Sequence, residues 1–276
     1  MKPELFIRSS AAWCTFVLLA GCSTTAPQNF NGYGTANVKA RPVVASFVRE
    51  QLRFSRVREA RDSTETAIQE MFREHNISYP ASEVYLRVFK QERSLELWVR
   101  STNNSRFQLL RTYPICALAG VLGPNRTQGD GQVPEGFYSI DLFNPSSAYH
   151  LSMRINYPNQ HDRAVSKQQH SLGGDIFIHG GCMSDGCVAI TDQAIRELYW
   201  IAVSARGMGQ QSIPVHIFPA RMDNVKRMQR ITSSHARDKS VLELWQTLRP
   251  GYDYFQKKQQ LPEIGVDDRG QYRITG

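Results

Sequence analysis

The sequence predicts an α+β protein with a β-rich centre and helical segments at both ends. Three observations predict this class. Residues 43–76 contain no Gly or Pro and repeat apolar side chains every three to four positions, as amphipathic helices do. Short runs that alternate apolar and polar residues follow between 83 and 219, which is typical of half-buried strands. Helical periodicity then returns after residue 191.

The first residues have the pattern of an export signal. Lys2 and Arg8 precede the apolar run AAWCTFVLLA, which is too short to span ~30 Å of hydrocarbon. The following LAGC, ending at Cys22, resembles the bacterial lipoprotein signal, in which cleavage before the cysteine is followed by its lipidation. The resemblance implies a periplasmic protein anchored to the outer membrane through Cys22. Ordinary signal cleavage near Ala26 is the alternative.

Composition divides the rest of the chain. After a signal over 1–21, residues 22–42 have few large apolar side chains and are expected to form a flexible tether. We expect a helical segment over 43–81, the β-rich domain over 82–220 and a helical extension over 221–276. The net charge of +8 is spread along the chain, without the basic block of a nucleic-acid-binding arm. It suits anionic surroundings such as cell-wall polymer, or serves solubility alone.

The β-rich centre is predicted from alternating segments. EVYLRVFK (83–90) and SLELWVR (94–100) flank QERS, which predicts a hairpin. The same alternation predicts strands at 106–116, 136–143, 150–157, 175–180 and 214–219. Glycines in GVLGPNRTQGDGQVP predict a long loop between Gly120 and Pro134.

The C-terminal third is predicted to be helical. Thr191 or Asp192 is suited to cap a helix that ends at Gly207. The stretches NVKRMQRITSS and SVLELWQTLRPGYDYFQKKQ predict a helical tail, interrupted at Pro250–Gly251.

Three cysteines, Cys116, Cys182 and Cys187, follow the presumed lipidation site in a compartment that favours disulfides. Three thiols form at most one disulfide within a chain, so at least one stays free in a monomer. A Cys116–Cys182 bond would leave Cys187 free. A buried thiol at Cys182 is the other interpretation, because the sequence does not give the Cα distances that decide pairing.

The stretch FIHGGCMSDGCVAIT admits three interpretations. His179, Cys182 and Cys187, completed by His170, have donor types that zinc binds, but they lack the tight spacing of common zinc knuckles. A Cys182–Cys187 disulfide is the second. The third is a cysteine nucleophile with a histidine base, which requires no metal or other cofactor, and we favour it.

The third interpretation gives the residues of the stretch distinct roles. DIFI predicts a buried strand ending at His179, and a glycine-containing loop then allows the imidazole to lie beside Cys187. Gly186 leaves room for a substrate carbonyl, and nearby backbone N–H groups suit a developing oxyanion. Strand character in CVAIT would hold the cysteine on a rigid element.

These residues resemble the L,D-transpeptidase catalytic domain, also called the YkuD domain. The resemblance rests on HG, on S-x-G-C and on VPEGFYSI, and covers about residues 82–220. It implies a mostly antiparallel, β-rich core with Cys187 as nucleophile and His179 as base. The motif positions matched besides these are Gly180, Ser184, Gly186, Pro134, Gly136 and Phe137.

Three departures and three longer stretches narrow the resemblance to one branch of the family. Asp185 and Ala189 stand where most of these enzymes have a histidine and an arginine, and the histidine–cysteine loop is short. The branch, which TYPICALAGVLGP, SAYHLSMRINYPNQHDRA and LWQTLRPGYDYF resemble, consists of murein amidases that cut the diaminopimelate–lysine amide and release peptidoglycan-bound outer-membrane lipoprotein. The alternatives are a transpeptidase that forms 3–3 crosslinks or attaches lipoprotein, and a non-catalytic peptidoglycan-binding lipoprotein.

The expected partners follow from this activity: peptidoglycan stem peptides, peptidoglycan-linked lipoprotein and, through lipid on Cys22, a membrane, but no nucleic acid. Because the substrate is rich in carboxylates, Arg163 is a candidate to bind it, and a surface arginine is the alternative. Tyr149 and His150 in SAYHLS are candidates to line the substrate site. Ser184 is expected to support the turn before Cys187.

Overall fold

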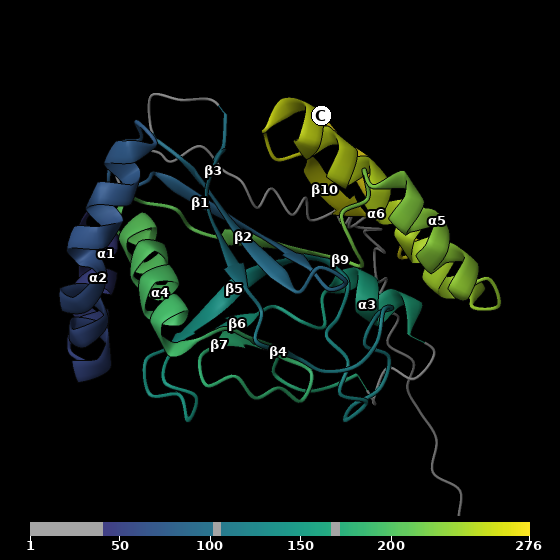
Figure 1. The fold of residues 1–276 in the computed structure, drawn as a ribbon, viewed down its shortest axis with the longest axis horizontal. Coiled ribbons are helices and arrows are strands. Elements are labelled where there is room, and N and C mark those ends of the chain that lie inside the picture. The colour runs from purple at the N-terminus through teal and green to yellow at the C-terminus, as the bar shows by residue number, and fades with distance from the viewer. Residues whose placement is uncertain (1–40, 102–105, 167–171) are drawn as a thin grey trace, which may run out of the picture. The chain divides into compact units, whose positions relative to one another are not determined.

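The computed structural model describes residues 41–101, 106–166 and 172–276 (Figure 1). The predicted signal over 1–21, most of the tether over 22–42, and Cys22 and His170 lie outside the described residues. Within these ranges, no helix is long and apolar enough to cross a membrane.

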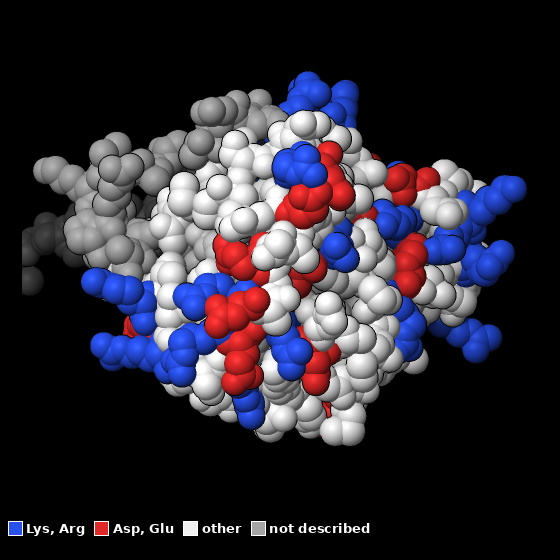
Figure 2. All heavy atoms as spheres, turned by 60° about the vertical axis from the view of Figure 1, so that its left-hand side comes forward, with Lys and Arg blue, Asp and Glu red and all other residues white. Residues whose placement is uncertain are grey.

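Two helices open the described chain, α1 (Arg41–Gln51) and α2 (Ser55–Glu74). α2 buries one face at helical spacing, and both helices pack against α4 (Asp192–Gly207), as Figure 1 shows. The buried side chains of α2 are Val57, Ala60, Thr64, Ile68, Met71 and Phe72. At the opposite face of α2, Arg61 pairs with Asp62 and Arg73 with Glu70, so Lys and Arg alternate with Asp and Glu on the surface in Figure 2.

The centre is a nine-stranded sheet in the order β3-β2-β1-β9-β5-β6-β7-β8-β4. The β1–β9 and β7–β8 pairs are parallel and the other pairs are antiparallel, so the predicted α+β class with a mostly antiparallel core is confirmed. The strands are β1 (Glu83–Phe89), β2 (Ser94–Arg100), β3 (Gln108–Pro114), β4 (Ala117–Leu118), β5 (Gly136–Asn144), β6 (Ser152–Ile155), β7 (Phe177–His179), β8 (Val188–Ala189) and β9 (Ile213–Phe218).

The sheet curls because its two edge strands, β3 and β4, are consecutive in the chain. Only Ile115 and Cys116 separate them. The Ile115 N–H donates to the Arg93 carbonyl at 2.8 Å, beside the β1–β2 turn, while the Cys116 N–H donates to the Ala189 carbonyl of β8 at 3.0 Å. Ile115 and Cys116 therefore bond to opposite sides of the sheet, one beside β2 and the other at β8. A flat sheet would hold these two sides too far apart.

Helix α4 covers one face of the sheet. Its N-cap is Thr191, one of the two predicted residues, whose hydroxyl accepts the Ala194 N–H at 3.2 Å. The helix packs on β1, β6 and β7, and Ile195, Leu198 and Ile201 are buried. Burial of this kind stabilises the fold by roughly 25 cal/mol per Å² of apolar surface removed from water.

The C-terminal segment contains α5 (Val225–Ser234) and α6 (Lys239–Lys258). The predicted interruption at Pro250–Gly251 is wrong, because α6 continues through Pro250. Proline removes one N–H donor, and the Gln246 residue whose carbonyl loses its partner is exposed, so water can satisfy that carbonyl. Gly251 lies close to Phe137, since a Cβ at this position would come within 2.7 Å of the ring.

Three further elements were not predicted from the sequence. A short helix, α3 (Gln160–Val165), is capped by the reciprocal bonds of Asn159 and Asp162. The strands β10 (Glu263–Val266) and β11 (Tyr272–Thr275) form a hairpin after α6.

A buried lysine fixes both ends of the long loop between Gly120 and Pro134. Lys90 is fully buried beside Glu135, with its Nζ 3.1 Å from Oε1. The same Nζ donates to the carbonyls of Gly123 and Val133, both at 2.7 Å. A buried charge needs this many partners to offset the loss of hydration. The loop therefore starts and ends at fixed positions beside β1.

Candidate active site

The parallel strands β7 and β8 carry the two residues on which the sequence interpretation centres. Ile178 is opposite Val188 and His179 is opposite Ala189. One residue earlier, the same register sets Phe177 opposite Cys187. Side chains of cross-strand partners share a sheet face, and every second residue of a strand returns to that face. The Cys187 sulfur and the His179 imidazole therefore emerge on one face of neighbouring strands.

Cys187 is a free thiol, partly exposed. Its Sγ accepts the Phe177 N–H at 3.4 Å and lies 3.9 Å from the Asp175 carbonyl oxygen. Burial raises the pKa of this thiol, and the carboxylates of Asp185 and Asp175 raise it further, while the Phe177 N–H acts in the opposite direction. The resting state at neutral pH is therefore the thiol.

His179 is a buried, neutral imidazole. Its Nδ1 lies 2.5 Å from the Gly180 carbonyl oxygen, and because a carbonyl only accepts, Nδ1 carries the proton. Nε2 is then the basic nitrogen. Burial lowers the pKa of His179, with an opposing contribution from the Gly180 carbonyl. The ring of Tyr149 stacks on it at a centroid distance of 4.7 Å.

A disulfide bonds the loop between β7 and β8 to the residue that precedes β4. Cys116 and Cys182 form this disulfide, with their Cα atoms 5.2 Å apart. The buried-thiol interpretation of Cys182 is therefore wrong, and so is a Cys182–Cys187 bond. The zinc alternative also loses a ligand, because the Cys182 sulfur is not available as a thiolate.

The turn before Cys187 is held by local bonds. The Ser184 hydroxyl donates to the Cys187 carbonyl at 2.7 Å and accepts the Ala119 N–H at 3.3 Å. Gly186 has φ +98°, a conformation that a residue with a Cβ adopts only with strain. A Cβ there would also lie 3.5 Å from the Gln132 carbonyl oxygen, so the long loop passes directly beside the turn.

The loop that carries Tyr149 and His150 is held by groups from two helices. The Gly180 N–H lies 3.2 Å from the Tyr149 carbonyl oxygen that accepts it. Arg56 of α2 donates to the carbonyls of Ser147 at 2.5 Å and His150 at 2.8 Å. His150 has φ +70°, so these bonds hold a backbone conformation that is otherwise unfavourable.

Further contacts join α4 to the same region. Arg196 donates from Nε to His150 Nε2 at 2.8 Å, and Asp192 accepts the Gly181 N–H at 2.8 Å. Burial lowers the pKa of His150, and the Arg196 charge lowers it further. The sequence interpretation missed Arg56, Arg196 and this role of Asp192. No local pattern marks them, because each acts on a residue far away in the chain.

Arg163 is the candidate residue that the structure leaves apart from this group. It is exposed on α3, next to the buried carboxyl group of Asp162; burial raises the pKa of Asp162 to about 7, and the Arg163 charge opposes this rise. Its backbone N–H donates to the Asn159 carbonyl at 3.2 Å, at the start of the same helix. The surface-arginine interpretation fits this position better than a role beside the sulfur.

Comparison with known proteins identifies the domain. Residues 83–217 match the family model of the L,D-transpeptidase catalytic domain, YkuD. The Escherichia coli K12 protein named "Putative L,D-transpeptidase YafK" is 38% identical over 205 residues, covering 74% of this chain and 78% of that protein.

Two solved structures are similar at lower identity. The helical cell shape determining protein Pgp2 of Campylobacter jejuni is 19% identical with a TM-score of 0.40, covering 50% of this chain and 48% of that one. Bd1075 of Bdellovibrio bacteriovorus is 20% identical with a TM-score of 0.36, covering 69% of this chain and 79% of that one.

Proposed function

Because the chain belongs to the L,D-transpeptidase (YkuD) family of peptidoglycan enzymes, we propose that it is a cysteine-dependent murein amidase. Its substrate is the diaminopimelate–lysine amide that links outer-membrane lipoprotein to peptidoglycan. The strand register supports the proposal: extended by one residue, it puts Cys187 on the face from which His179 emerges, after a turn in which Gly186 has φ +98°.

The proposed reaction proceeds through a thioester. The Cys187 sulfur attacks the diaminopimelate carbonyl carbon as its proton passes to Nε2 of His179. The C–N bond breaks, and the imidazolium returns the proton to the leaving lysine amine. Water, deprotonated by the same imidazole, then hydrolyses the thioester and regenerates the thiol.

The pKa directions favour proton transfer during attack over a resting ion pair. Burial raises the pKa of Cys187 and lowers the pKa of His179, so both groups are neutral at rest. A neutral imidazole is the form that accepts a proton. The charge pair then exists only while the tetrahedral intermediate does, where backbone N–H groups of the turn at Gly186 are suited to stabilise the oxyanion.

Substrate recognition differs from that of most family members at position 189. The Ala189 side chain is fully buried in β8, so no cation from this position reaches a substrate carboxylate. Tyr149 is 41% exposed where it stacks on His179, which makes its ring a surface against which the stem peptide can lie.

The second candidate is a transpeptidase, and the name of the Escherichia coli relative favours it. The thioester is the same in both reactions. An amine resolves it in the transpeptidase, either from a second stem peptide to form a 3–3 crosslink or from a lipoprotein lysine.

Incubation of the purified protein with lipoprotein-linked sacculi separates these functions. The amidase releases lipoprotein and leaves the crosslink composition unchanged in muropeptide analysis. New 3–3 crosslinks or fresh attachment of lipoprotein would overturn the amidase. Release of no lipoprotein by the parent, together with a Cys187→Ala variant that keeps the cellular role, would instead support a non-catalytic role.

We also propose that the enzyme works in the periplasm from a lipid anchor on Cys22, which lies outside the described residues. The tether over 22–42 would let the catalytic domain reach peptidoglycan from the outer membrane. Metabolic labelling with a fatty acid should mark the parent protein and leave Cys22→Ala unlabelled.

A further inference from the structure

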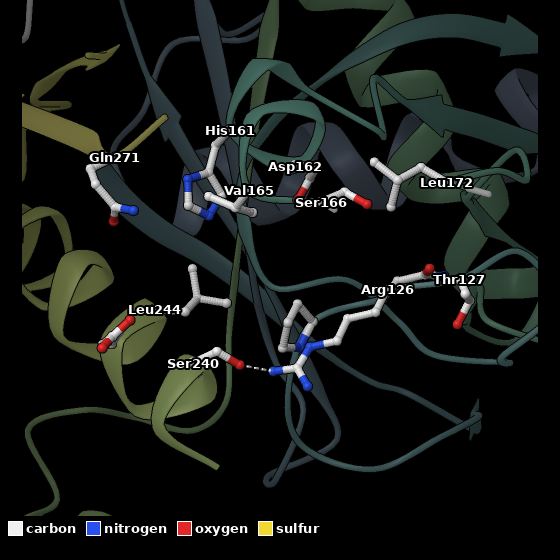
Figure 3. Close-up of a pocket in the computed structure, with 13 residues that line it drawn as sticks. Arg126, Thr127, His161, Asp162, Val165, Ser166, Leu172, Ser240, Leu244 and Gln271 are labelled. Carbon is white, nitrogen blue, oxygen red and sulfur yellow. Dashed lines mark hydrogen bonds between the residues drawn. The ribbon is translucent and has the colours of Figure 1, made fainter. Parts of the chain in front are cut away.

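A pocket of about 520 Å³ lies between the long loop and the C-terminal segment (Figure 3). Its walls come from loop residues such as Arg126, from α3 through His161 and Val165, and from α6 through Glu243 and Leu244. Residues of α6 and the C-terminal hairpin lie beyond the 83–217 range of the family domain. The pocket is therefore a feature that the C-terminal segment adds to the catalytic core.

Two chain segments connect the pocket to the Cys187 sulfur. Leu172 lines the pocket, and three residues later the Asp175 carbonyl oxygen lies 3.9 Å from Sγ. Three residues span at most about 11 Å. The long loop forms the second connection, because its residues from Pro124 to Thr127 line the pocket while Gln132 contacts Gly186. A peptide substrate bound at the sulfur could therefore extend into the pocket with only a few of its residues.

The charges of the lining favour a cationic ligand over an anionic one. Its described lining holds one guanidinium, Arg126, and one exposed carboxylate, Glu243. The carboxyl group of Asp162 also lies in the lining, but it is buried, accepts from the Tyr138 hydroxyl and the Asn159 N–H, and has its pKa raised by burial to about 7. Arg126 is already paired with Asp238, outside the lining, through two bonds of 3.2 Å. The anionic stem peptide would therefore meet the Glu243 carboxylate and no unpaired cation in this described lining.

The neutral groups of the lining suit a ligand that has hydrogen-bond donors and apolar side chains. Nδ1 of His161 lies 2.6 Å from the Gly270 carbonyl, so Nδ1 donates and Nε2 is an acceptor. Burial lowers the pKa of His161, which keeps the ring neutral. Leu172, Leu244 and Val165 supply apolar surface, and Figure 3 shows Val165 and Leu244 facing each other across the pocket.

We propose that this pocket, the α6 pocket, binds the polypeptide on the leaving side of the scissile amide. The occupant is the two or three residues next to the linked lysine, with apolar and basic side chains. This inference rests on the proposed amidase function. It adds a means by which the enzyme distinguishes a lysine within a polypeptide from a single lysine residue.

Two synthetic substrates test the inference. Both carry a stem tripeptide joined through diaminopimelate to a lysine side chain. In the long substrate, two leucines and two arginines precede the lysine, and in the short substrate the lysine is acetylated and amidated. We expect a KM at least about tenfold lower for the long substrate, with a similar kcat. Equal KM values would overturn the proposal.

A charge reversal in the pocket should change KM in opposite directions, depending on whether the leaving-side polypeptide or the anionic stem peptide occupies the pocket. Glu243→Lys should raise KM for the long substrate about two- to fivefold and leave the short substrate unchanged. Asp253→Lys, on the same helix but outside the pocket, is the matched control. If the anionic stem peptide occupied the pocket, Glu243→Lys would lower KM for both substrates.

A pocket-filling variant tests the same point without charge. Val165→Trp should raise the KM of the long substrate to that of the short one, whereas Val225→Trp, at another exposed valine, should not. If wild-type protein cleaves neither substrate, the amidase proposal fails. The pocket is then judged by calorimetry of the free leucine–arginine–lysine peptide with Cys187→Ala protein. Binding that Val165→Trp abolishes supports the pocket, and absence of binding refutes it.

Discussion

The phenol ring of Tyr149 lies against the imidazole of His179, with centroids 4.7 Å apart and the planes tilted by 31°. Tyr149 belongs to a loop that Arg56 of α2 holds by two carbonyl bonds. The N-terminal helices therefore determine the surroundings of the proposed base, although they lie outside the family domain.

Removal of the Arg56 guanidinium should lower the rate without unfolding the protein. Arg56→Ala leaves the carbonyls of Ser147 and His150 without this donor, so the stack on His179 loosens and kcat falls about tenfold. Arg58→Ala is the matched control, because Arg58 donates to the carbonyls of Leu52 and Arg53, just after α1. A loss of activity that is equal in both variants would contradict the positioning role.

Replacement of the sulfur should abolish turnover. Cys187→Ala and Cys187→Ser should each reduce amide cleavage by at least about 10³-fold, as loss of a nucleophile does in other enzymes. Because the side chain is partly exposed and small, the melting temperature should change little. Mass spectrometry should detect a substrate adduct on Cys187 in the parent and none in either variant.

The pH profile should reflect the neutral resting pair. His179 acts as a base only when deprotonated, and burial lowers its pKa, so kcat/KM should rise with pH below about 6.5 and be level above that value. A resting ion pair would instead need a thiol pKa below that of the imidazole. A rate that first rises between pH 8 and 9 would contradict His179 as the base.

Buried histidines should make the fold sensitive to acid. Burial lowers the pKa of His216 to about 3, and the charge of Arg87 lowers it further. The His216 side chain takes up a proton near pH 6.5 in the unfolded chain but stays neutral in the folded chain. The folded state is therefore fully stable with respect to this group above pH 6.5, and its free energy of unfolding decreases as the pH falls below that value. His216 alone should contribute roughly 1.4 kcal/mol of lost stability per pH unit below pH 6. Urea unfolding of parent and His216→Phe at pH 7.5 and 5.0 measures the difference.

The disulfide should stabilise the fold and fix the turn. Cys116 and Cys182 are 66 residues apart, and closing a loop of that length is worth about 4 kcal/mol in the chain-entropy model. The Cys116→Ser, Cys182→Ser double variant should melt at a lower temperature and lose activity. Alkylation of native protein should label Cys187 and spare the other two, and label on Cys116 would contradict the pairing.

The sequence interpretation succeeded where the signal was local. Alternation in residues 83–100 predicted the β1–β2 hairpin, and the HG and S-x-G-C segments predicted the family that the comparison confirms. The catalytic roles of His179 and Cys187 stay predictions. The continuation of α6 through Pro250 could not be predicted, because it depends on solvent access and on the fit of Gly251 against Phe137.

Other features depend on contacts between distant residues. Arg56 meets the His150 carbonyl across 94 positions, and neither residue carries a pattern that indicates the other. The Cys116–Cys182 pairing stayed open at the sequence level for the same reason, since only the curl of the sheet brings Cys116 to the turn.

Lys90 fixes the long loop at Gly123 and Val133 and makes no demand on the residues between them. Residues 126–130 are exposed, so this part can change in length or sequence while β1 and the turn at Gly186 keep their positions. If the α6 pocket selects the ligand as proposed, mutation and selection can alter that selection in the loop without rebuilding the turn at Gly186. One buried ammonium group would then let the loop and the turn evolve separately.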